Sequence, residues 1–506
     1  MGIRRGYACA VIALALFPSL LSAFPAVFGR AFTGATLAQD TRSTREEIER
    51  LIDQAPTQRG KSNPTDGPWD QPWKEEDLPA SLLERRDFLW DVGGWAKASW
   101  TTFDTVFGKD TTLTDYDARA WLKLGYTENQ TLYSRFRTFY TSYNTGDSPT
   151  GDDDDWQSFR VDQLFYEGRW ARTLDLDPSI DLDLTVGRQF FFIGKGLVLS
   201  NVLDGARFDA RFGPCGGMLM AAQTIHFSPD IDPTVPEDKR ESDRNFFGGH
   251  LYTTALFDRY FYAYGMAQVD RNHYNDGAQS WNYYSNYFGI GGDGGIPIPG
   301  LRENELSYGF EFMFETGRSA ADGTTDEEDI SAFGWLLDIN WLPGDLLPVP
   351  TRFVGSYYFG SGDGDRSLQL GTVAGNTPGT EDKALNYFGF ANTGYSLAPR
   401  LTNLHMFRLN GEARLIEKGD FYRYTRELKV GVSLYSFYKH HQNALITDFT
   451  SSENSSYLGT EIDTYIDWII FSDFDISIRH GTFLPGSAFG QHKSRNFLSI
   501  SGTFSF

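Results

Sequence analysis

The last twelve residues of the chain alternate between apolar and small polar side chains. One face of this segment carries Asn496, Leu498, Ile500, Gly502, Phe504 and Phe506, and the other carries Ser499, Ser501, Thr503 and Ser505, with Phe497 as its one apolar member. A two-residue period is that of a β-strand with one apolar and one polar face. The edges of such a strand need partners, so the pattern predicts that it pairs within a sheet.

The same period recurs along the chain from about residue 87. One of the clearest cases sets Leu306, Tyr308, Phe310, Phe312 and Phe314 against Glu305, Ser307, Glu311 and Glu315. Eighteen candidate strands lie at 87–103, 114–126, 131–144, 156–171, 180–191, 202–212, 217–227, 245–257, 260–272, 281–291, 303–317, 330–342, 351–361, 401–415, 424–439, 457–470, 473–483 and 495–506. The pattern predicts an all-β fold, a transmembrane antiparallel up-and-down β-barrel whose apolar face meets lipid.

The lengths of the connections between these strands are consistent with a barrel. When the sides are alternated from a periplasmic C-terminus, the short connections at 127–130, 258–259 and 471–472 all fall inside. The long connections all fall outside, at 144–155, 228–244, 318–329, 362–400 and 440–456. Short periplasmic turns and long extracellular loops are typical of outer-membrane barrels. The 362–400 connection is too long for a bare loop, and we expect a short helix at 381–390 that folds over or into the mouth.

Composition fits this prediction. The chain has 506 residues, 16% of them aromatic, 52 glycines and a mean hydropathy of only −0.39. After the N-terminus it contains no run of about 20 apolar residues of the kind that forms a membrane-spanning helix. Barrels distribute their apolar residues by alternation, so low mean hydropathy with many aromatic residues is expected of them. A large soluble all-β or multidomain protein is the alternative.

The N-terminal part differs from the rest. Arg4 and Arg5 precede an apolar run over residues 7–28, which predicts a secretory signal peptide at 1–38, with a retained anchor as the alternative. Residues 39–86 contain a capping box at Ser43 and Glu46 followed by a proline-rich stretch. We interpret them as a periplasmic segment with a short helix and a linker, ahead of a barrel at 87–506. These features place the protein in the outer membrane of a Gram-negative cell.

Charge and cysteine content exclude several classes of function. The net charge of −22 argues against nucleic acid as a partner. Cys215 is the only cysteine after the signal peptide, so no intrachain disulfide is expected. Acidic runs at 151–155, 326–329 and 363–365 either bind divalent cations or are simply solvated, as such runs usually are. We expect no metal site at the adjacent His440 and His441.

Catalytic motifs are not found. The sequence has no G-x-S-x-G elbow, no H-E-x-x-H pair and no phosphate-binding loop. We therefore expect no enzyme activity and no cofactor, although a barrel-embedded hydrolase assembled from distant strands is an open alternative.

If the apolar face of each strand meets lipid, the opposite face lines a water-filled lumen. That rule places eleven basic residues inside, on two arcs of the wall: Arg119, Lys123, Arg135, Arg137, Arg207, Arg211, Arg352, Arg408, Arg414, Lys429 and Arg479. It also places acids inside: Glu305, Glu311, Glu315, Asp338, Glu461, Asp463, Asp467 and Asp475. Fixed charge selects which solutes pass, and arginine offers carboxylates a two-pronged contact. The alternative is internal pairing of arginines and acids that stiffens the barrel.

Three stretches resemble a known family. Residues 479–490 read R-H-G-T-F-L-P-G-S-A-F-G, residues 182–189 read L-D-L-T-V-G-R-Q with D-G-A-R at 204–207, and residues 161–170 read V-D-Q-L-F-Y-E-G-R-W. These stretches are similar to the pattern of the alginate export family of outer-membrane barrels. The resemblance implies an eighteen-stranded barrel with an electropositive constriction that passes an anionic exopolysaccharide.

The chain departs from the family pattern at two places. Only Arg479 stands where the family has two arginines, with Ser477 at the other position. Strict alternation puts Arg188 beside Val186 on the lipid side, so a bulge at Gly187 would be needed to turn it inward.

These observations lead to three functional hypotheses. The first is an outer-membrane channel of the alginate-export type that passes an anionic polysaccharide, in contact with membrane lipid and with periplasmic export partners. The second is a substrate-selective porin for small solutes. The third is a non-transport barrel, either a surface hydrolase or an adhesin.

Overall fold

A computed structural model describes residues 88–506, apart from residues 107–108, 127–128, 149–153, 226–227, 229, 233–234, 236–240, 257–258, 299–304, 370 and 417–424. The signal peptide at 1–38 and the periplasmic segment at 39–86 lie outside the described residues and stay predictions.

The described residues form eighteen strands: β1 (Phe88–Asp104), β2 (Asp110–Tyr126), β3 (Gln130–Tyr143), β4 (Asp154–Arg169), β5 (Ile180–Ile193), β6 (Leu199–Phe212), β7 (Cys215–Gln223), β8 (Arg244–Leu256), β9 (Arg259–Asp270), β10 (Tyr283–Gly295), β11 (Leu306–Ala320), β12 (Glu327–Trp341), β13 (Thr351–Gly360), β14 (Leu404–Ile416), β15 (Glu427–Lys439), β16 (Tyr457–Ile469), β17 (Phe474–Pro485) and β18 (Arg495–Ser505). Each predicted segment overlaps one of them. A one-turn helix, α3 (Trp170–Thr173), and a 3-10 turn, η4 (Gly344–Leu346), are the helical elements of this part of the chain.

The strands close into a barrel. Each strand pairs antiparallel with its neighbours in the sequence, and β18 returns to β1 through a register that runs from Trp95 opposite Ser505 to Phe103 opposite Phe497. The predicted antiparallel barrel of eighteen strands is thereby confirmed. Closure leaves no free sheet edge, which is the condition for placing strands in lipid.

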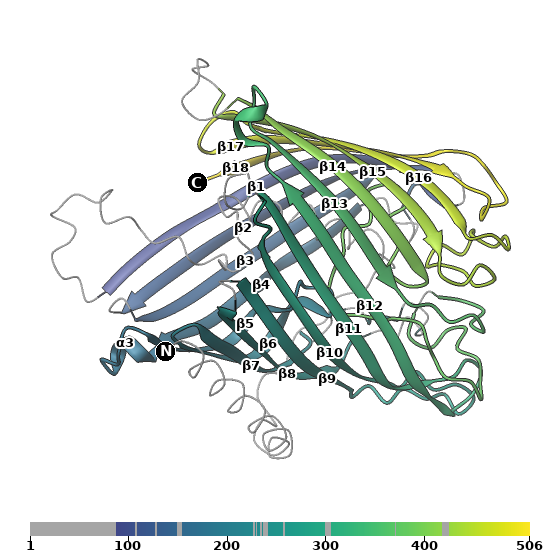
Figure 1. The fold of residues 1–506 in the computed structure, drawn as a ribbon, viewed down its shortest axis with the longest axis horizontal. Coiled ribbons are helices and arrows are strands. Elements are labelled where there is room, and N and C mark those ends of the chain that lie inside the picture. Colours follow the sequence, from purple (N-terminus) through teal and green to yellow (C-terminus); the bar gives the residue numbers. More distant parts are fainter. Residues whose placement is uncertain are drawn as a thin grey trace.

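The two ends of the barrel differ. Figure 1 shows the long connections gathered at one end of the tilted strands, with α3 and the C-terminus towards the other. By the usual orientation, the end with the long connections is extracellular and the other is periplasmic. Across the described residues, no helix is both long and apolar enough to cross a membrane.

The alternation seen in the sequence is reproduced as alternating burial. On β18, Ile500 and Phe504 are 41% and 52% exposed, while Ser501 and Thr503 are 6% and 4% exposed. The exposed apolar side chains form the outward, lipid-facing surface of the barrel. The other face is the lumen wall, because it contacts the chain that folds inside.

Residues 361–403, here called the inner segment, connect β13 to β14 and fold into the barrel. Asp382 forms an isolated bridge with Ile330 of β12, and Phe388 forms one with Leu199 of β6. The expectation that this connection enters the mouth is correct, but the helix expected at 381–390 is wrong. The backbone amides there bond to other parts of the barrel instead of to each other: that of Asp382 donates to the Asp329 carbonyl (2.9 Å) and that of Phe388 to the Val198 carbonyl (3.0 Å).

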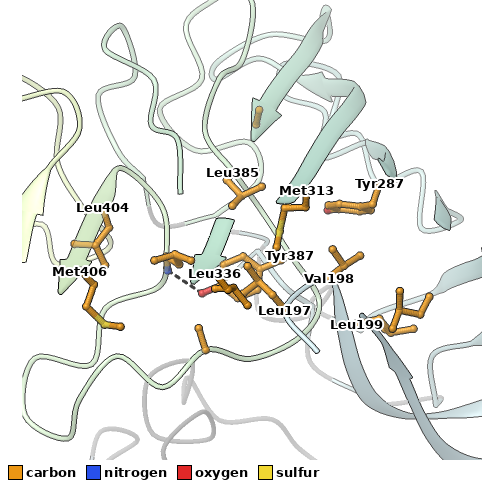
Figure 2. Close-up of a cluster of buried hydrophobic side chains, with 14 of the residues drawn as sticks. Leu197, Val198, Leu199, Tyr287, Met313, Leu336, Leu385, Tyr387, Leu404 and Met406 are labelled. Atoms are coloured by element: carbon orange, nitrogen blue, oxygen red, sulfur yellow. Dashed lines mark hydrogen bonds between the residues drawn. The ribbon is translucent and has the colours of Figure 1, made fainter. Parts of the chain in front are cut away.

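A hydrophobic core fixes the inner segment to the wall. Figure 2 shows Leu385 and Tyr387 of this segment among wall side chains that include Leu336, Met313 and Leu404. The Tyr387 hydroxyl accepts a hydrogen bond from the Leu401 amide at 2.8 Å. The connection from β5 to β6 also folds inward, and its Leu197 and Val198 are fully buried in the same core.

A buried ion pair organises the first half of the inner segment. Arg366 lies 3.1 Å from Asp382, and both side chains are completely buried. Burial raises the pKa of Asp382, and the Arg366 guanidinium opposes that rise. The second guanidinium nitrogen of Arg366 donates to the carbonyls of Gly371 and Ala374, so this one side chain closes a loop of the segment on itself.

The far side of the inner segment is tied to β16 by a carboxylate. Glu461 accepts hydrogen bonds from three consecutive amides, those of Tyr395 (2.7 Å), Ser396 (2.7 Å) and Leu397 (2.8 Å). Hydrogen bonds to a charged acceptor are stronger than those between neutral groups. Glu461 is therefore a strong point of attachment between the inner segment and the wall.

The two ends of the inner segment meet at the loop after β15. The amides of His440 and His441 donate to the carbonyl (3.2 Å) and the side-chain oxygen (2.7 Å) of Asn403. The amide of Gly362 donates to Nδ1 of His440 at 3.3 Å. We call these contacts of His440 and His441 with Asn403 and Gly362 the hinge. The bond from Gly362 requires an unprotonated Nδ1, so the hinge depends on the protonation state of His440.

Replacing Glu461 with Gln should loosen the inner segment. The neutral amide oxygen is a weaker acceptor for the three backbone amides, and we expect the packed position of the segment to lose roughly 2 kcal/mol. Single-channel recording in a planar bilayer should then show a larger or more frequently fluctuating conductance. Glu427→Gln is the matched control, because Glu427 is also a lumen carboxylate but pairs with Arg414 on the wall. Identical recordings from the two variants would contradict the anchoring role.

Acid should release the hinge. Burial and the neighbouring His441 and His405 lower the pKa of His440 to about 4. Because this is below the unfolded value of about 6.5, the contribution of neutral His440 is fully present above pH 6.5 and is lost as the pH falls towards 4. Channel fluctuations should rise over that range in the wild type and in His492→Gln, but much less in His440→Gln. An unchanged pH response in His440→Gln would refute the hinge.

Candidate functional site: the charged lumen

All eleven basic residues singled out in the sequence occupy lumen-facing positions of the strands. Their neighbours in sequence occupy the outward face: on β2, for example, Ala118 and Ala120 are exposed on either side of the buried Arg119. Their position follows the alternation, while their role as anion contacts stays a prediction.

The strongest concentration of positive charge lies on β2, β3 and β4. Arg119 of β2 is directly opposite Arg137 of β3, and Arg137 is directly opposite Arg160 of β4. Arg135 lies two residues from Arg137 on the same face of β3. We call these four residues the arginine row.

Two carboxylates pair with the arginine row. Asp117 lies 2.8 Å from Arg119 and 2.9 Å from Arg137. Asp162 lies 2.5 Å from Arg135 and 3.7 Å from Arg119. Within the row itself, four guanidinium groups therefore face two paired carboxylates.

Two aromatic rings lie beside the row. The guanidinium carbons of Arg119 and Arg135 are 5.4 Å and 5.5 Å from the centre of the Trp95 ring. Those of Arg137 and Arg160 are 4.9 Å and 5.4 Å from the centre of the Phe139 ring. Stacking of this kind orients a planar guanidinium without removing its charge, so the row is held in place by rings as well as by carboxylates.

Arg160 was missed in the sequence. Two bulges in the β3–β4 pairing change which residues of β4 face the lumen: Arg160 lies between the two bulges and Gln163 lies on the periplasmic side of both, and both residues face the lumen. A single alternation applied to the whole of β4 therefore cannot place Arg160. The apolar neighbours Phe159 and Val161 are the local signal that could have placed it. Lys97 of β1, between Ala96 and Ala98, is a second basic lumen residue that was missed.

The second arc of basic residues, on β13 to β17, is balanced by acids. Lys429 lies 3.7 Å from Glu412 and 3.5 Å from Asp467, and Asp467 also pairs with Arg479 at 2.5 Å. Arg414 lies 3.3 Å from Glu427. On this arc the internal pairing considered as an alternative describes the geometry well.

The remaining basic residues are spread over the wall. Arg207 pairs with Asp209 at 2.7 Å and Arg211 donates to Asp181 at 2.6 Å, both towards the periplasmic end. Lys123 lies opposite Asp91 of β1. Arg352 donates to the Asn340 side chain at 2.6 Å. Arg408 lies on β14, next to Tyr435 of β15 and Ser356 of β13 in the ladder.

Two of the predicted lumen acids hold the interior together. Glu311 is fully buried and accepts hydrogen bonds from the hydroxyls of Tyr262 (2.7 Å) and Tyr264 (3.1 Å). Glu315 is also fully buried and accepts a hydrogen bond from the Asn386 amide of the inner segment (2.9 Å). Both point inward as expected, but packing keeps them away from a water-filled path.

Arg188 lies on the outward face, as strict alternation requires. The pairing of β5 with β4 and β6 is regular around Gly187, so there is no bulge to turn Arg188 inward. Its guanidinium instead forms two hydrogen bonds to Asp204, at 2.7 Å and 2.9 Å, and donates to the Val161 carbonyl at 2.9 Å. In the described residues the β4–β5 ladder stops at Leu164 opposite Arg188. The Val161 carbonyl lies beyond that point of β4, and Arg188 supplies it with a hydrogen-bond donor.

The acidic runs at 326–329 and 363–365 show no metal-binding arrangement, and most of the run at 151–155 lies outside the described residues. Within the described residues, no group of three or more His, Cys, Asp or Glu side chains is placed to hold a metal ion. Asp363 is buried and accepts hydrogen bonds from the amides of Asp365 and Lys383, which is a structural role within the inner segment.

Comparison with known proteins agrees with the barrel. The family model described as alginate export matches residues 180–500. OccK5 (OpdH) of Pseudomonas aeruginosa is a similar solved structure, with 12% identity, coverage of 82% of this chain and 98% of that chain, and a TM-score of 0.50. A doubly substituted OccD1 (OprD) gives 13% identity, 84% and 97% coverage, and a TM-score of 0.50. The outer membrane protein OpdK from Pseudomonas aeruginosa gives 12% identity, coverage of 82% of this chain and 99% of that chain, and a TM-score of 0.48.

At such low identity these structures establish the fold alone, and no curated protein matches the sequence. The family model covers more than half of the 506 residues, and both the family and the fold are those of transport porins, not of enzymes. The chain therefore belongs to the alginate export family and is an outer-membrane β-barrel channel.

Proposed function

We propose that this channel passes an anionic exopolysaccharide of the alginate type, with the arginine row as the main contact for the carboxylates of the moving chain. The observation that carries the proposal is the direct opposition of Arg119, Arg137 and Arg160 on adjacent strands. Membership of the alginate export family supports the same cargo.

The arginine row is costly to the fold. Like charges directly opposite each other on neighbouring strands destabilise a sheet, and only two carboxylates compensate four arginines here. On β14 to β17, by contrast, Arg414, Lys429 and Arg479 each pair directly with an acid. A row in which arginines outnumber the carboxylates that pair with them therefore supports a function that needs positive charge.

The arginine row also suits a chain of carboxylates. A guanidinium binds a carboxylate through two parallel hydrogen bonds, and its charge does not depend on pH in the physiological range. Neighbouring arginines on adjacent strands, about 5 Å apart, offer successive contacts that a moving polyanion can exchange. Exchange between several sites of moderate strength allows binding without trapping the cargo.

A second candidate is a channel for small anionic solutes. The inner segment favours it, because this segment is packed against the wall through the buried Leu385 and Tyr387 and through Glu461. A small carboxylate needs less free cross-section than a polysaccharide. The two candidates share the arginine row and differ in the size of the cargo.

Charge reversal in the arginine row should weaken anion passage. Arg137→Glu and Arg160→Glu remove positive charge that faces the lumen, and we expect the block of channel current by a polyuronate to weaken roughly tenfold, which is about 1.4 kcal/mol. The ratio of anion to cation permeability should fall as well. The measurement is single-channel conductance in a planar bilayer at fixed salt, since the block is electrostatic and is screened by ions.

Arg211→Glu is the matched control, because Arg211 also faces the lumen but lies outside the arginine row beside Asp181. Block by the polyuronate in all three variants at the wild-type level would overturn the proposal. Comparing the polymer with its monomer separates the two candidates: an exporter should be blocked by the polymer at far lower concentration, and a small-solute channel should pass the monomer and ignore the polymer.

A further inference from the structure

A groove of about 470 Å³ crosses the outward face of β13 to β17. Its floor is made by Gly411, Ala413 and Thr464, and its walls by Phe353, Val430 and Ile466. All six are outward-facing positions of their strands. The groove follows the pairing register, in which Ala413, Val430 and Ile466 lie side by side on consecutive strands.

The groove exists because small residues replace large ones on a surface that is otherwise covered by apolar side chains. On β14, Leu409 and Leu415 flank the groove and are 66% and 47% exposed. A Cβ atom added to Gly411 would lie 3.4 Å from the Phe353 ring, in ordinary contact, so a larger side chain could be built there only by extending into the groove. The volume is within the range of about 300–1,000 Å³ that ligand pockets occupy.

The groove lies near the periplasmic ends of its strands. Ala413 is three residues from the end of β14, Val430 is three residues from the start of β15, and Ile466 is three residues from the end of β16. In the usual orientation of such barrels this is the level of the periplasmic leaflet.

Arg426 and Trp468 lie on the periplasmic side of the groove. Arg426 is exposed and immediately precedes β15, and its amide donates to the Ile469 carbonyl, so its position continues the ladder. In that register it shares the outward face with Val430, four residues or roughly 13 Å further along the strand. Trp468 is also outward-facing, and its indole donates to the Thr425 hydroxyl at 3.3 Å.

The nearest carboxylate in sequence does not neutralise Arg426 on this surface. Glu427 faces the lumen, where it lies 3.3 Å from Arg414. Tryptophan at the edge of the hydrocarbon region and a basic residue just beyond it are the side chains that contact lipid headgroups.

We propose that this surface is a binding site for one phospholipid of the periplasmic leaflet, with an acyl chain in the groove and the phosphate at Arg426. Lipid covers the outward face of the barrel in any case, and lipid tails are as apolar as the groove. Selection of one bound molecule therefore comes from the fit of the chain between Phe353 and Ile466 and from the charge of Arg426, not from hydrophobic transfer.

Native mass spectrometry of the full chain tests this site. The protein is reconstituted in vesicles of phosphatidylethanolamine and phosphatidylglycerol and then transferred to a mild detergent. Wild type should retain one phospholipid. Gly411→Leu fills the groove and should lower the retained fraction at least fivefold. Gly502→Leu is the matched control, because Gly502 is also outward-facing and a Cβ there would lie 3.5 Å from the Phe474 ring.

The variant Arg426→Gln tests the headgroup contact without altering the groove. It should lower retention about fivefold, the effect expected of one basic residue near an anionic surface, and the loss should be larger for phosphatidylglycerol. Equal retention by Gly411→Leu and Gly502→Leu would overturn the proposal, as would a wild type that keeps no phospholipid. A wild type that leaves the vesicles as a dimer, lost in Gly411→Leu, would also overturn it and assign the groove to a second copy of the chain.

Discussion

In the hydrocarbon core of a bilayer there is no water to bond a free backbone amide or carbonyl, so every strand must find a partner on both sides. The pairing of β18 with β1 gives every strand of the sheet a partner on both sides. The same need to bond every backbone group also accounts for the position of Arg188 on the outward face. Where the β4–β5 ladder stops, its guanidinium donates to the Val161 carbonyl and Asp204 balances its charge. A charged pair on the outward face is thus a consequence of the need to satisfy the backbone.

The strands and the lumen-facing positions could be predicted from the sequence, because lipid outside and water inside impose opposite polarity on alternate residues. On β2, the charged Asp117 and Arg119 alternate with Tyr116, Ala118 and Ala120 in the sequence, and in the structure the two charged side chains are buried while the other three are exposed. The inner segment could not be predicted in this way. The partner of the Phe388 amide is the carbonyl of Val198, far away in the sequence, and no local pattern at 381–390 indicates that a distant acceptor replaces a helical one.

The charges of the lumen were predicted in position but not in pairing. Whether a basic residue is neutralised depends on the strand next to it, and pairing register is not visible in one strand alone. Asp467 serves both Lys429 and Arg479, which makes β15 to β17 a balanced surface. Asp162 reaches Arg135 only because a bulge on β4 turns it inward. Because of the same bulge, simple alternation along β4 could not place Arg160, the residue that completes the arginine row.

The inner segment divides the interior unequally. The hydrophobic core that binds it includes Phe191 of β5, Phe246 of β8, Leu336 of β12 and Phe437 of β15, and within the described residues no member comes from β1 to β4. A water-filled path cannot run through a close-packed apolar core. The wall of β1 to β4, where Trp95, Phe139 and the arginine row face the lumen, contributes no side chain to that core among the described residues, so we expect the path to run along it. The packing of the inner segment against β5 to β17 thus favours a solute path beside the arginine row.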